Sequence, residues 1–457
     1  MRSYFGRKGE IVSPTKAETV HGSPFDELAP PERSEIESLR RRIFSALFEL
    51  IEEEGAEDLT DESAVLACID ELIDEARRNG SAGVPVSHWQ QVRREVLDEV
   101  LGLGPLAPLL ANPDVSDVLV NGPNEVWVDK QGRLERTDVK FDDERHLRRL
   151  LDRLVAMHGR HIDASSPHVD AKLDDGSRLH AVVPPLSVRG AVVSIRRFRA
   201  RRFEEQELLE QGFFSPQALE LLRIAVESRR NVVIAGGAAA GKTSLLNLLS
   251  RFIPADERIV TVEETSELRL EHPHVVSLET RPPNIEGRGG IGLRELVKTA
   301  LRMRADRIIV GEVRGEETLD MLQAMNVGHD GSLTTVHASS PGDVIHRLEW
   351  MALMGAANVS RDVVRGMIAS ALDLIVYVTR FRDGRRVVTS IHEVRRGKDD
   401  IVVRELFRFE PRRRCTNGPT VGRHVAVQSP MFLQELAAAG YPVPEHLLPA
   451  VKEGAGQ

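Results

Sequence analysis

Apolar residues recur at helical spacing in three stretches between residues 34 and 101, and polar turns separate the stretches. This pattern predicts a small bundle of three amphipathic helices, and no residue in it suggests chemistry. Residues 1–33 differ, because they mix proline, serine, glycine and both charge signs without an apolar period. We expect these residues to form a disordered arm. The apolar positions of the three predicted helices are Ile36, Leu39, Ile43, Leu47 and Leu50; Val65, Ile69, Leu72 and Ala76; and Trp89, Val92, Val96 and Val100.

Short alternating runs replace the helical pattern after residue 101, with glycine and proline between them. We therefore predict a separate α+β domain over residues 102–200. Its positive and negative charges nearly cancel, which does not suit a basic nucleic-acid module. Residues 201–214 are charged and rich in glutamate, and are interpreted as a linker. The runs expected to be strands are 117–120, 125–129, 178–183 and 191–198, and residues 145–159 are expected to be a helix.

Strand and helix patterns alternate from residue 215 to about residue 380. Such alternation predicts an α/β fold with a parallel or mostly parallel sheet and helices on its faces. Ser215 and Pro216 are typical of a helix start, and helical patterning returns at 431–439 within a domain that we extend to residue 457. Arginines 412–414 are interpreted as a solvated surface run. The expected strands are 231–235, 258–262, 275–278, 307–310 and 374–378.

Composition narrows the class of protein. The net charge of −9 and an aromatic content of 4% give no support to nucleic-acid binding. No apolar run approaches the ~20 residues that cross a bilayer, and no signal segment opens the sequence, so we expect a cytoplasmic protein. The two cysteines, Cys68 and Cys415, lie far apart and outside any C-x-x-C pair. We expect reduced thiols, with neither a disulfide nor a zinc site.

The strongest chemical signal is the sequence Gly-Gly-Ala-Ala-Ala-Gly-Lys-Thr at residues 236–243. It matches a phosphate-binding loop, and an expected strand precedes it while an expected helix follows it. In such a loop the backbone N–H groups bind a polyphosphate, Lys242 lies on the β- and γ-phosphates, and the Thr243 hydroxyl binds Mg²⁺. A plain glycine turn between a strand and a helix is the alternative. The expected ATP-binding residues are Gly236, Gly237, Ala238, Ala239, Ala240, Gly241, Lys242, Thr243 and Ser244.

Acidic residues follow two of the expected strands. Glu312 comes directly after an apolar run, where it is placed to hold Mg²⁺ or to orient the attacking water. Glu263 and Glu264 follow another strand, although a solvated turn explains that cluster equally well. His329 and His337 lie eight residues apart, which is too far for a shared metal face on a helix. We interpret both histidines as sensors of the γ-phosphate.

In combination, residues 100 to about 380 resemble the type II/type IV secretion ATPase superfamily, the hexameric motors of secretion and pilus assembly. The resemblance is closest to the branch that powers Flp (tight adherence) pili, known as CpaF or TadA. The family's four motifs fall in order on residues 236–243, 261–267, 304–314 and 328–337. Further matches lie at 104–110, 120–123, 173–178 and 194–198, and the preceding helical bundle also suits this branch.

The resemblance implies a RecA-like P-loop ATPase core that hydrolyses Mg²⁺-bound ATP. It also implies a ring of six chains that acts on an inner-membrane platform protein, so the protein would associate with that membrane through partners. Glu312 would be the catalytic glutamate, and Thr243, Glu264 and Glu312 would serve the metal. The other residues to which the resemblance gives a role are Glu263, for metal and water; His337 and His329, for nucleotide sensing; and Arg178, Arg196 and Arg197, which would approach the phosphates.

Two departures from the family pattern affect the expected activity. The family usually has Thr-Gly-Ser where this chain has three alanines, and a positive φ at Ala239 would cost about 1 kcal/mol. Val327 stands where a threonine commonly precedes Gly-His. A nucleotide-gated scaffold with little turnover is therefore one alternative, and a type IV secretion or conjugation motor is another. The neutral N-terminal domain disfavours a DNA-pumping relative. The chain also lacks the tetracysteine zinc motif of many type II secretion and type IV pilus extension ATPases.

Overall fold

A computed structural model gives the arrangement of the chain. It describes residues 36, 38–44, 46, 47, 62–78, 86–130, 133–197, 204–281, 288–355, 359–398, 400–411 and 421–447. The predicted arm, Leu50, Cys415 and arginines 412–414 lie outside these residues. Contacts group the chain into two units, 1–128 with 135–169 and 181–194, and 129–134 with 170–180 and 195–457. We describe each unit by itself.

Helices α2 (Glu62–Arg78) and α3 (Val86–Leu101) pack with the helical residues between 36 and 47 in the first unit. Their apolar stripes meet in one buried cluster, which contains Leu47, Ile69 and Val96. The sequence analysis assigned Leu72 to the apolar face of the second helix. In the structure its neighbour Ile73 is buried there, and Leu72 is only partly buried. The burial of these stripes holds the helices together, since short helices gain most of their stability from packing.

A six-stranded sheet in the order β3-β2-β1-β6-β5-β4 follows the helices. The sequence did not predict its two edge strands, β3 and β4. Helix α5 begins after Asp143, whose carboxylate accepts a hydrogen bond from the His146 N–H at 2.7 Å. The elements are η2 (Gly104–Leu106), α4 (Ala107–Ala111), β1 (Val115–Val120), β2 (Val126–Lys130), β3 (Arg133–Arg136), α5 (Glu144–Ala156), β4 (His168–Lys172), β5 (Arg178–Val182) and β6 (Val192–Arg196).

The second unit is built on a nine-stranded sheet in the order β15-β14-β13-β12-β7-β11-β10-β8-β9. The strands from β12 to β9 are parallel neighbours, as the alternating sequence pattern predicted. The strands are β7 (Val232–Gly236), β8 (Ile259–Glu263), β9 (Val275–Glu279), β10 (Arg307–Val313), β11 (Leu333–His337), β12 (Leu374–Arg380), β13 (Arg386–Arg396), β14 (Ile401–Pro411) and β15 (Gly422–Ala426). The helices are α6 (Glu205–Glu210), α7 (Pro216–Glu227), α8 (Lys242–Ser250), α9 (Leu293–Ala300), α10 (Glu317–Asn326), α11 (Asp343–Met354), α12 (Arg361–Ala371), α13 (Met431–Ala438) and η3 (Glu445–Leu447).

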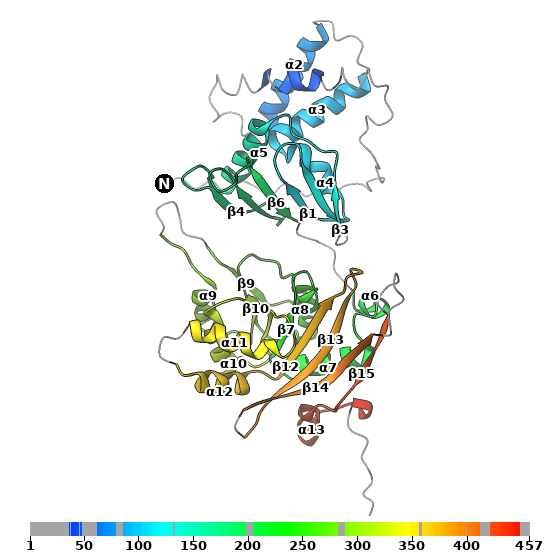
Figure 1. The fold of residues 1–457 in the computed structure, drawn as a ribbon, viewed down its shortest axis with the longest axis vertical. Helices are drawn as coiled ribbons and strands as arrows, with labels where there is room; N and C mark the ends of the chain where they lie inside the picture. The colour runs from blue at the N-terminus through cyan, green and yellow to red at the C-terminus, as the bar shows by residue number, and fades with distance from the viewer. Residues whose placement is uncertain are drawn as a thin grey trace, which may run out of the picture. The chain divides into compact units, whose positions relative to one another are not determined.

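Two apolar cores cover the two faces of this sheet (Figure 1). Helices α7 and α8 belong to one core, and α9 to α12 belong to the other, where α10, α11 and α12 pack on one another. Every residue of β7 is buried, because helices cover the strand on both faces. This architecture confirms the predicted α/β fold with a RecA-like core. No helix among the described residues is long and apolar enough to cross a bilayer.

Strands β13 to β15 extend the sheet in the antiparallel sense beyond β12. The sequence analysis expected no strand after residue 378, so this extension is a correction. Residues 204–214, which the sequence analysis assigned to a linker, contain α6 and contribute Phe213 and Phe214 to the core. The Val388 N–H of β13 donates to the Phe213 carbonyl at 2.7 Å, which fixes this segment to the sheet extension.

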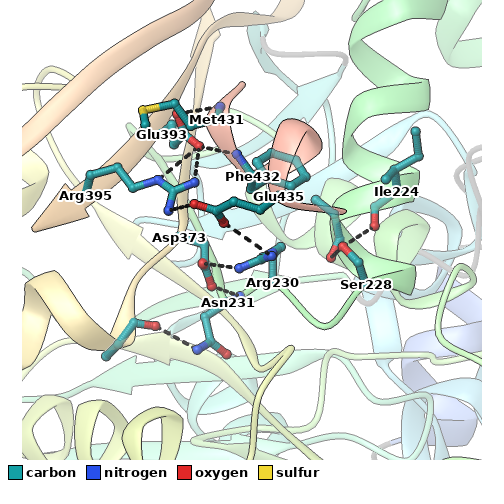
Figure 2. A network of polar contacts seen from close by, with 12 residues as sticks. Ile224, Ser228, Arg230, Asn231, Asp373, Glu393, Arg395, Met431, Phe432 and Glu435 are labelled. Atoms are coloured by element: carbon teal, nitrogen blue, oxygen red, sulfur yellow. Dashed lines mark hydrogen bonds and ion pairs between the residues drawn. The ribbon is translucent and has the colours of Figure 1, made fainter. Parts of the chain in front are cut away.

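A buried glutamate attaches α13 to the sheet extension (Figure 2). Glu393 of β13 is 1% exposed, and its carboxylate accepts hydrogen bonds from the N–H groups of Met431 and Phe432 at 3.1 and 2.9 Å. These N–H groups lie in the first turn of α13, where a carboxylate is favourable. Arg395 and Arg404 neutralise the same carboxylate at 3.0 and 2.9 Å. The buried charge is therefore fully paired.

Removal of this carboxylate tests the attachment. Glu393→Ala would remove the buried acceptor that two guanidinium groups and two helix N–H groups share, so we expect the free energy of unfolding to fall by about 3 kcal/mol. Glu435→Ala is the matched control, because Glu435 also binds Arg395 but its side chain is 50% exposed, and we expect a loss below ~1 kcal/mol. Urea unfolding and hydrogen exchange in α13 measure both effects. Equal losses in the two variants would contradict the assignment.

Candidate functional site

The phosphate loop lies where β7 ends and α8 begins. In parallel sheets the carboxyl ends of the strands form the edge at which ligands bind. A Cβ atom on Gly236 would lie 2.2 Å from the Val378 carbonyl oxygen of β12, so only glycine permits this approach. Gly241 precedes α8 with a left-handed φ of 100°, which also favours glycine. The loop thus delivers the first N–H groups of α8 to the ligand edge.

Lys242 carries a buried positive charge inside the loop. The residue is 6% exposed, and its Nζ atom donates to the carbonyls of Gly236 and Gly237 at 3.3 and 3.0 Å. Burial lowers the pKa of Lys242, and the charge of Glu312 opposes that shift. A buried ammonium group that faces mainly neutral partners is suited to an anion, because a phosphate would supply negative charge in place of the water that burial removes.

Glu312 and His337 meet Lys242 at the ligand edge. The Oε1 atom of Glu312, near the end of β10, lies 3.9 Å from Lys242 Nζ and contacts His337 Nδ1. The other ring nitrogen, His337 Nε2, lies 3.3 Å from Lys242 Nζ. Oε1 is buried, and its neighbours at the loop are the His337 ring and the Lys242 ammonium group. The structure therefore brings together three of the predicted site residues.

Arg314 joins the two acidic motifs. It donates to Glu312 Oε2 through Nε at 2.8 Å and to Glu264 Oε2 through Nη1 at 2.8 Å. The sequence analysis placed Arg314 inside a motif but gave it no role. The guanidinium holds the two carboxylates beside each other and limits the negative charge around the loop.

Glu263 is placed differently from its neighbour Glu264. It is 3% exposed, and its Oε1 atom accepts hydrogen bonds from the N–H groups of Glu267 and Leu268 at 2.8 and 2.9 Å. Burial raises the pKa of Glu263 to about 7, although the backbone hydrogen bonds oppose the shift. Glu263 thus closes the turn after β8, while the Glu264 side chain is 55% exposed and faces Arg314.

His329 is not part of this cluster. His329 precedes β11, whereas His337 ends it, so His329 lies at the opposite edge of the sheet and its Nδ1 contacts the Ala305 carbonyl at 2.9 Å. This corrects the expectation that both histidines share the site. Arg178 begins β5, and its Nη2 atom lies 3.2 Å from Glu267 Oε1 and donates to the Thr265 carbonyl at 3.2 Å, in the acidic motif after β8. Arg196 ends the neighbouring β6 and Arg197 follows it; burial lowers the pKa of Lys242, and the charge of Arg196 adds to that shift. Contact of the three arginines with a nucleotide stays a prediction.

Arg386 supports the loop from β13, and sequence reasoning missed it. Its Nε atom donates to the Ala239 carbonyl at 2.9 Å, and Ala239 has a left-handed φ of 54°. A Cβ atom on Gly241 would lie 3.3 Å from Arg386 Cδ and 3.7 Å from Phe213. Arg386 is 147 residues from Ala239 and lies on a strand that was not predicted, so no local signal was available.

The residues at the loop fit a magnesium ion that is bound together with a nucleotide. Mg²⁺ takes most of its ligands from phosphate and water and needs only one or two protein groups. Thr243 in the first turn of α8 offers a hydroxyl, and Glu312 offers a carboxylate beside Lys242 and His337. Glu264, the third predicted metal residue, is already bound to Arg314. Among the described residues, no group of three or more His, Cys, Asp or Glu side chains could hold a metal without a nucleotide.

Comparison with known proteins identifies relatives over most of these elements. A family model described as type II/IV secretion system protein matches residues 99–424. A putative conjugal transfer protein of Mycobacterium tuberculosis is 40% identical over 311 residues, which cover 67% of this chain and 88% of that protein. The type IV secretion system protein PtlH of Bordetella pertussis is 32% identical over 301 residues, covering 60% and 88%. The solved VirB11 ATPase of the Brucella suis type IV secretion system, in complex with sulphate, is 30% identical, covers 63% and 95%, and has a TM-score of 0.35.

The strain at Ala239 can be measured with two glycine variants. Ala239→Gly removes a left-handed alanine, which costs about 1–2 kcal/mol, and this relief offsets the ~0.4–1 kcal/mol that glycine loses in chain entropy. Ala238→Gly is the control, because Ala238 has no positive φ and only the entropy loss applies. We expect Ala239→Gly to be more stable than Ala238→Gly by about 1 kcal/mol in urea unfolding. The same stability in both variants would argue against strain at Ala239.

The raised pKa of Glu263 predicts a pH-dependent stability. The folded state keeps its proton up to about pH 7 while the unfolded state loses it near 4.5, so stability falls as pH rises through this window. Glu263→Gln cannot ionise, so its free energy of unfolding relative to wild type should rise by roughly 2–3 kcal/mol between pH 5 and pH 8. Thermal or urea unfolding across this range measures the difference. Glu264→Gln is the control and should retain the wild-type slope; a parallel wild-type and Glu263→Gln profile would refute the prediction.

Proposed function

This chain belongs to the type II/IV secretion system protein family, and on that premise we propose that it is a Mg²⁺-dependent ATP hydrolase that drives such a machine. The observation that carries the proposal is the meeting of Lys242, His337 and Glu312 at the phosphate loop. The ATP triphosphate would enter the loop, where the N–H groups of α8 and the Lys242 ammonium would bind it.

Phosphoryl transfer needs positioning and charge stabilisation more than covalent chemistry. When bound, Mg²⁺ supplies charge neutralisation on the phosphate oxygens. Glu312 would orient the attacking water through its carboxylate, which His337 contacts at Oε1 and Arg314 holds at Oε2. His337 contacts both Glu312 and Lys242, so it can respond when a phosphate arrives. Glu263 would act indirectly by closing the turn that carries Glu264.

The proposal extends to a ring of six chains that acts on an inner-membrane platform protein from the cytoplasmic side. Family membership supports the ring, and light scattering with and without nucleotide measures the number of chains. The order of motifs and the helical bundle favour a pilus motor of the CpaF or TadA branch. The relatives named for conjugal transfer and type IV secretion favour a motor of that second kind. The genes that flank this one would distinguish the two.

Removal of the Glu312 charge tests the catalytic assignment. Glu312→Gln keeps the shape of the side chain, so ATP binding should persist, whereas hydrolysis should fall by about 10²–10⁴-fold. Steady-state phosphate release and ATP binding by fluorescence measure the two effects. Glu316→Gln is the matched control, because Glu316 is exposed, pairs with Arg294 and lies outside the loop. It should retain wild-type turnover.

Two outcomes would change the conclusion. Near wild-type turnover in Glu312→Gln would remove the catalytic role of this carboxylate. The nucleotide-gated scaffold would be favoured by two results together. Wild type would bind ATP while Lys242→Ala does not, and wild type would release phosphate no faster than Lys242→Ala. The observation that supports this second function is the left-handed φ of Ala239 in the phosphate loop.

A further inference from the structure

A cavity of about 320 Å³ opens beside the phosphate loop, within the second unit. The loop backbone at Gly237 and Ala238 forms one wall, and the ends of β11 and β12 form another. Arg347 from α11 and Arg380 at the end of β12 also line it. Lys242 and Glu312 are not among the lining residues, so this cavity shares a wall with the loop but lies beside the position of those two residues.

The cavity is lined by two positively charged side chains, and the charge of Asp343 acts on its lining residue Tyr377. None of its lining residues is a carboxylate, and neither Arg347 nor Arg380 forms an ion pair with a described residue. The Nε atom of Arg347 is buried and donates no hydrogen bond to any described group. Two acids lie near Arg347 on the same helix. Glu349 binds Arg361 and Arg365, and Asp343 accepts a hydrogen bond from the Ser339 N–H at 3.4 Å. A buried donor without an acceptor is costly, so the Arg347 guanidinium is suited to an anion, and Arg380 adds a second positive charge to the same cavity.

His337 connects the cavity to the loop site. Its ring lines the cavity, while its two nitrogens contact Lys242 and Glu312. The anion that would appear at this wall is the phosphate that hydrolysis detaches from ATP. The planar fork of a guanidinium matches two oxygens of a phosphate. A carboxylate ligand would need only one such group, whereas this cavity has two, so a phosphate fits it better.

We propose that this cavity is a second oxyanion site, in which Arg347 and Arg380 bind inorganic phosphate after it leaves the loop. The source of the phosphate rests on the proposed ATPase function, but the binding site itself does not. Attack of water on ATP gives ADP, inorganic phosphate and a proton, and the phosphate then moves past His337 without forming a covalent bond. The cavity would hold the product apart from ADP.

The test is equilibrium binding of radiolabelled inorganic phosphate to the full chain saturated with ADP and Mg²⁺, which fill the loop. We expect Arg347→Ala and Arg380→Ala each to weaken phosphate binding at least tenfold while ADP affinity is unchanged. Arg382→Ala is the matched control, because Arg382 is exposed, lies two residues from Arg380 and does not line the cavity. Arg347→Lys should have an intermediate affinity, since it keeps the charge but loses the fork.

The outcomes separate this proposal from the ATPase assignment. Absence of phosphate binding by the ADP-bound wild type, or the same affinity in all variants, overturns the oxyanion site even if ATP is hydrolysed. Phosphate binding that depends on Arg347 in a protein without turnover keeps the site and removes the activity. If wild type does not bind ADP, the same phosphate titration is carried out on Lys242→Ala protein, in which the loop lacks its positive charge. A change in the number of associated chains with unchanged phosphate affinity would assign the cavity to a contact between copies, which also overturns the proposal.

Discussion

The common edge of the parallel strands is the constraint on which the site depends. Strands β7, β11 and β10 are apolar and buried between two helical layers, so their register cannot slip without exposing a core face. That register pairs His337 with Gly236 and places the end of β10 next to β11. Lys242 and Glu312 are polar residues at the rim of this apolar framework. Hydrophobic burial far larger than any polar contact thus sets the distances among the three site residues.

Local patterns were sufficient to predict the parts of the site that one strand and its following loop supply. The phosphate loop and Glu312 each follow an apolar run, and the structure places both at the ligand edge. The same reasoning could not separate His329 from His337, because both flank a single strand and only its direction decides between them. It also could not separate Glu263 from Glu264. Successive residues at a strand end face opposite sides, so one is buried and the next is half exposed.

Contacts between distant segments account for what the sequence did not predict. Strands β13 to β15 show some alternation, yet their pairing with β12 depends on neighbours that the sequence does not identify. Arg386, Arg347 and Arg380 come from three separate elements, and only the fold brings them to the loop. The left-handed Ala239 was anticipated as a condition, because a loop of this shape needs a positive φ at its middle residue. The hydrogen bond from Arg386 to this residue could not be predicted from the sequence.

Hydrolysis turns one bound polyanion into two anions that repel each other, and the repulsion is strong where water is excluded. In this chain the cations near the loop are divided into two sets. Lys242 lies inside the loop, Arg347 and Arg380 line the neighbouring cavity, and His337 contacts the first and lines the second. Arg347 belongs to α11, which packs on α10 and α12 rather than inside the buried sheet. A negative charge that moves past His337 would therefore act on α11 in the helical layer. If ATP is hydrolysed at the loop as proposed, this contact would give the reaction a physical route to motion in that layer.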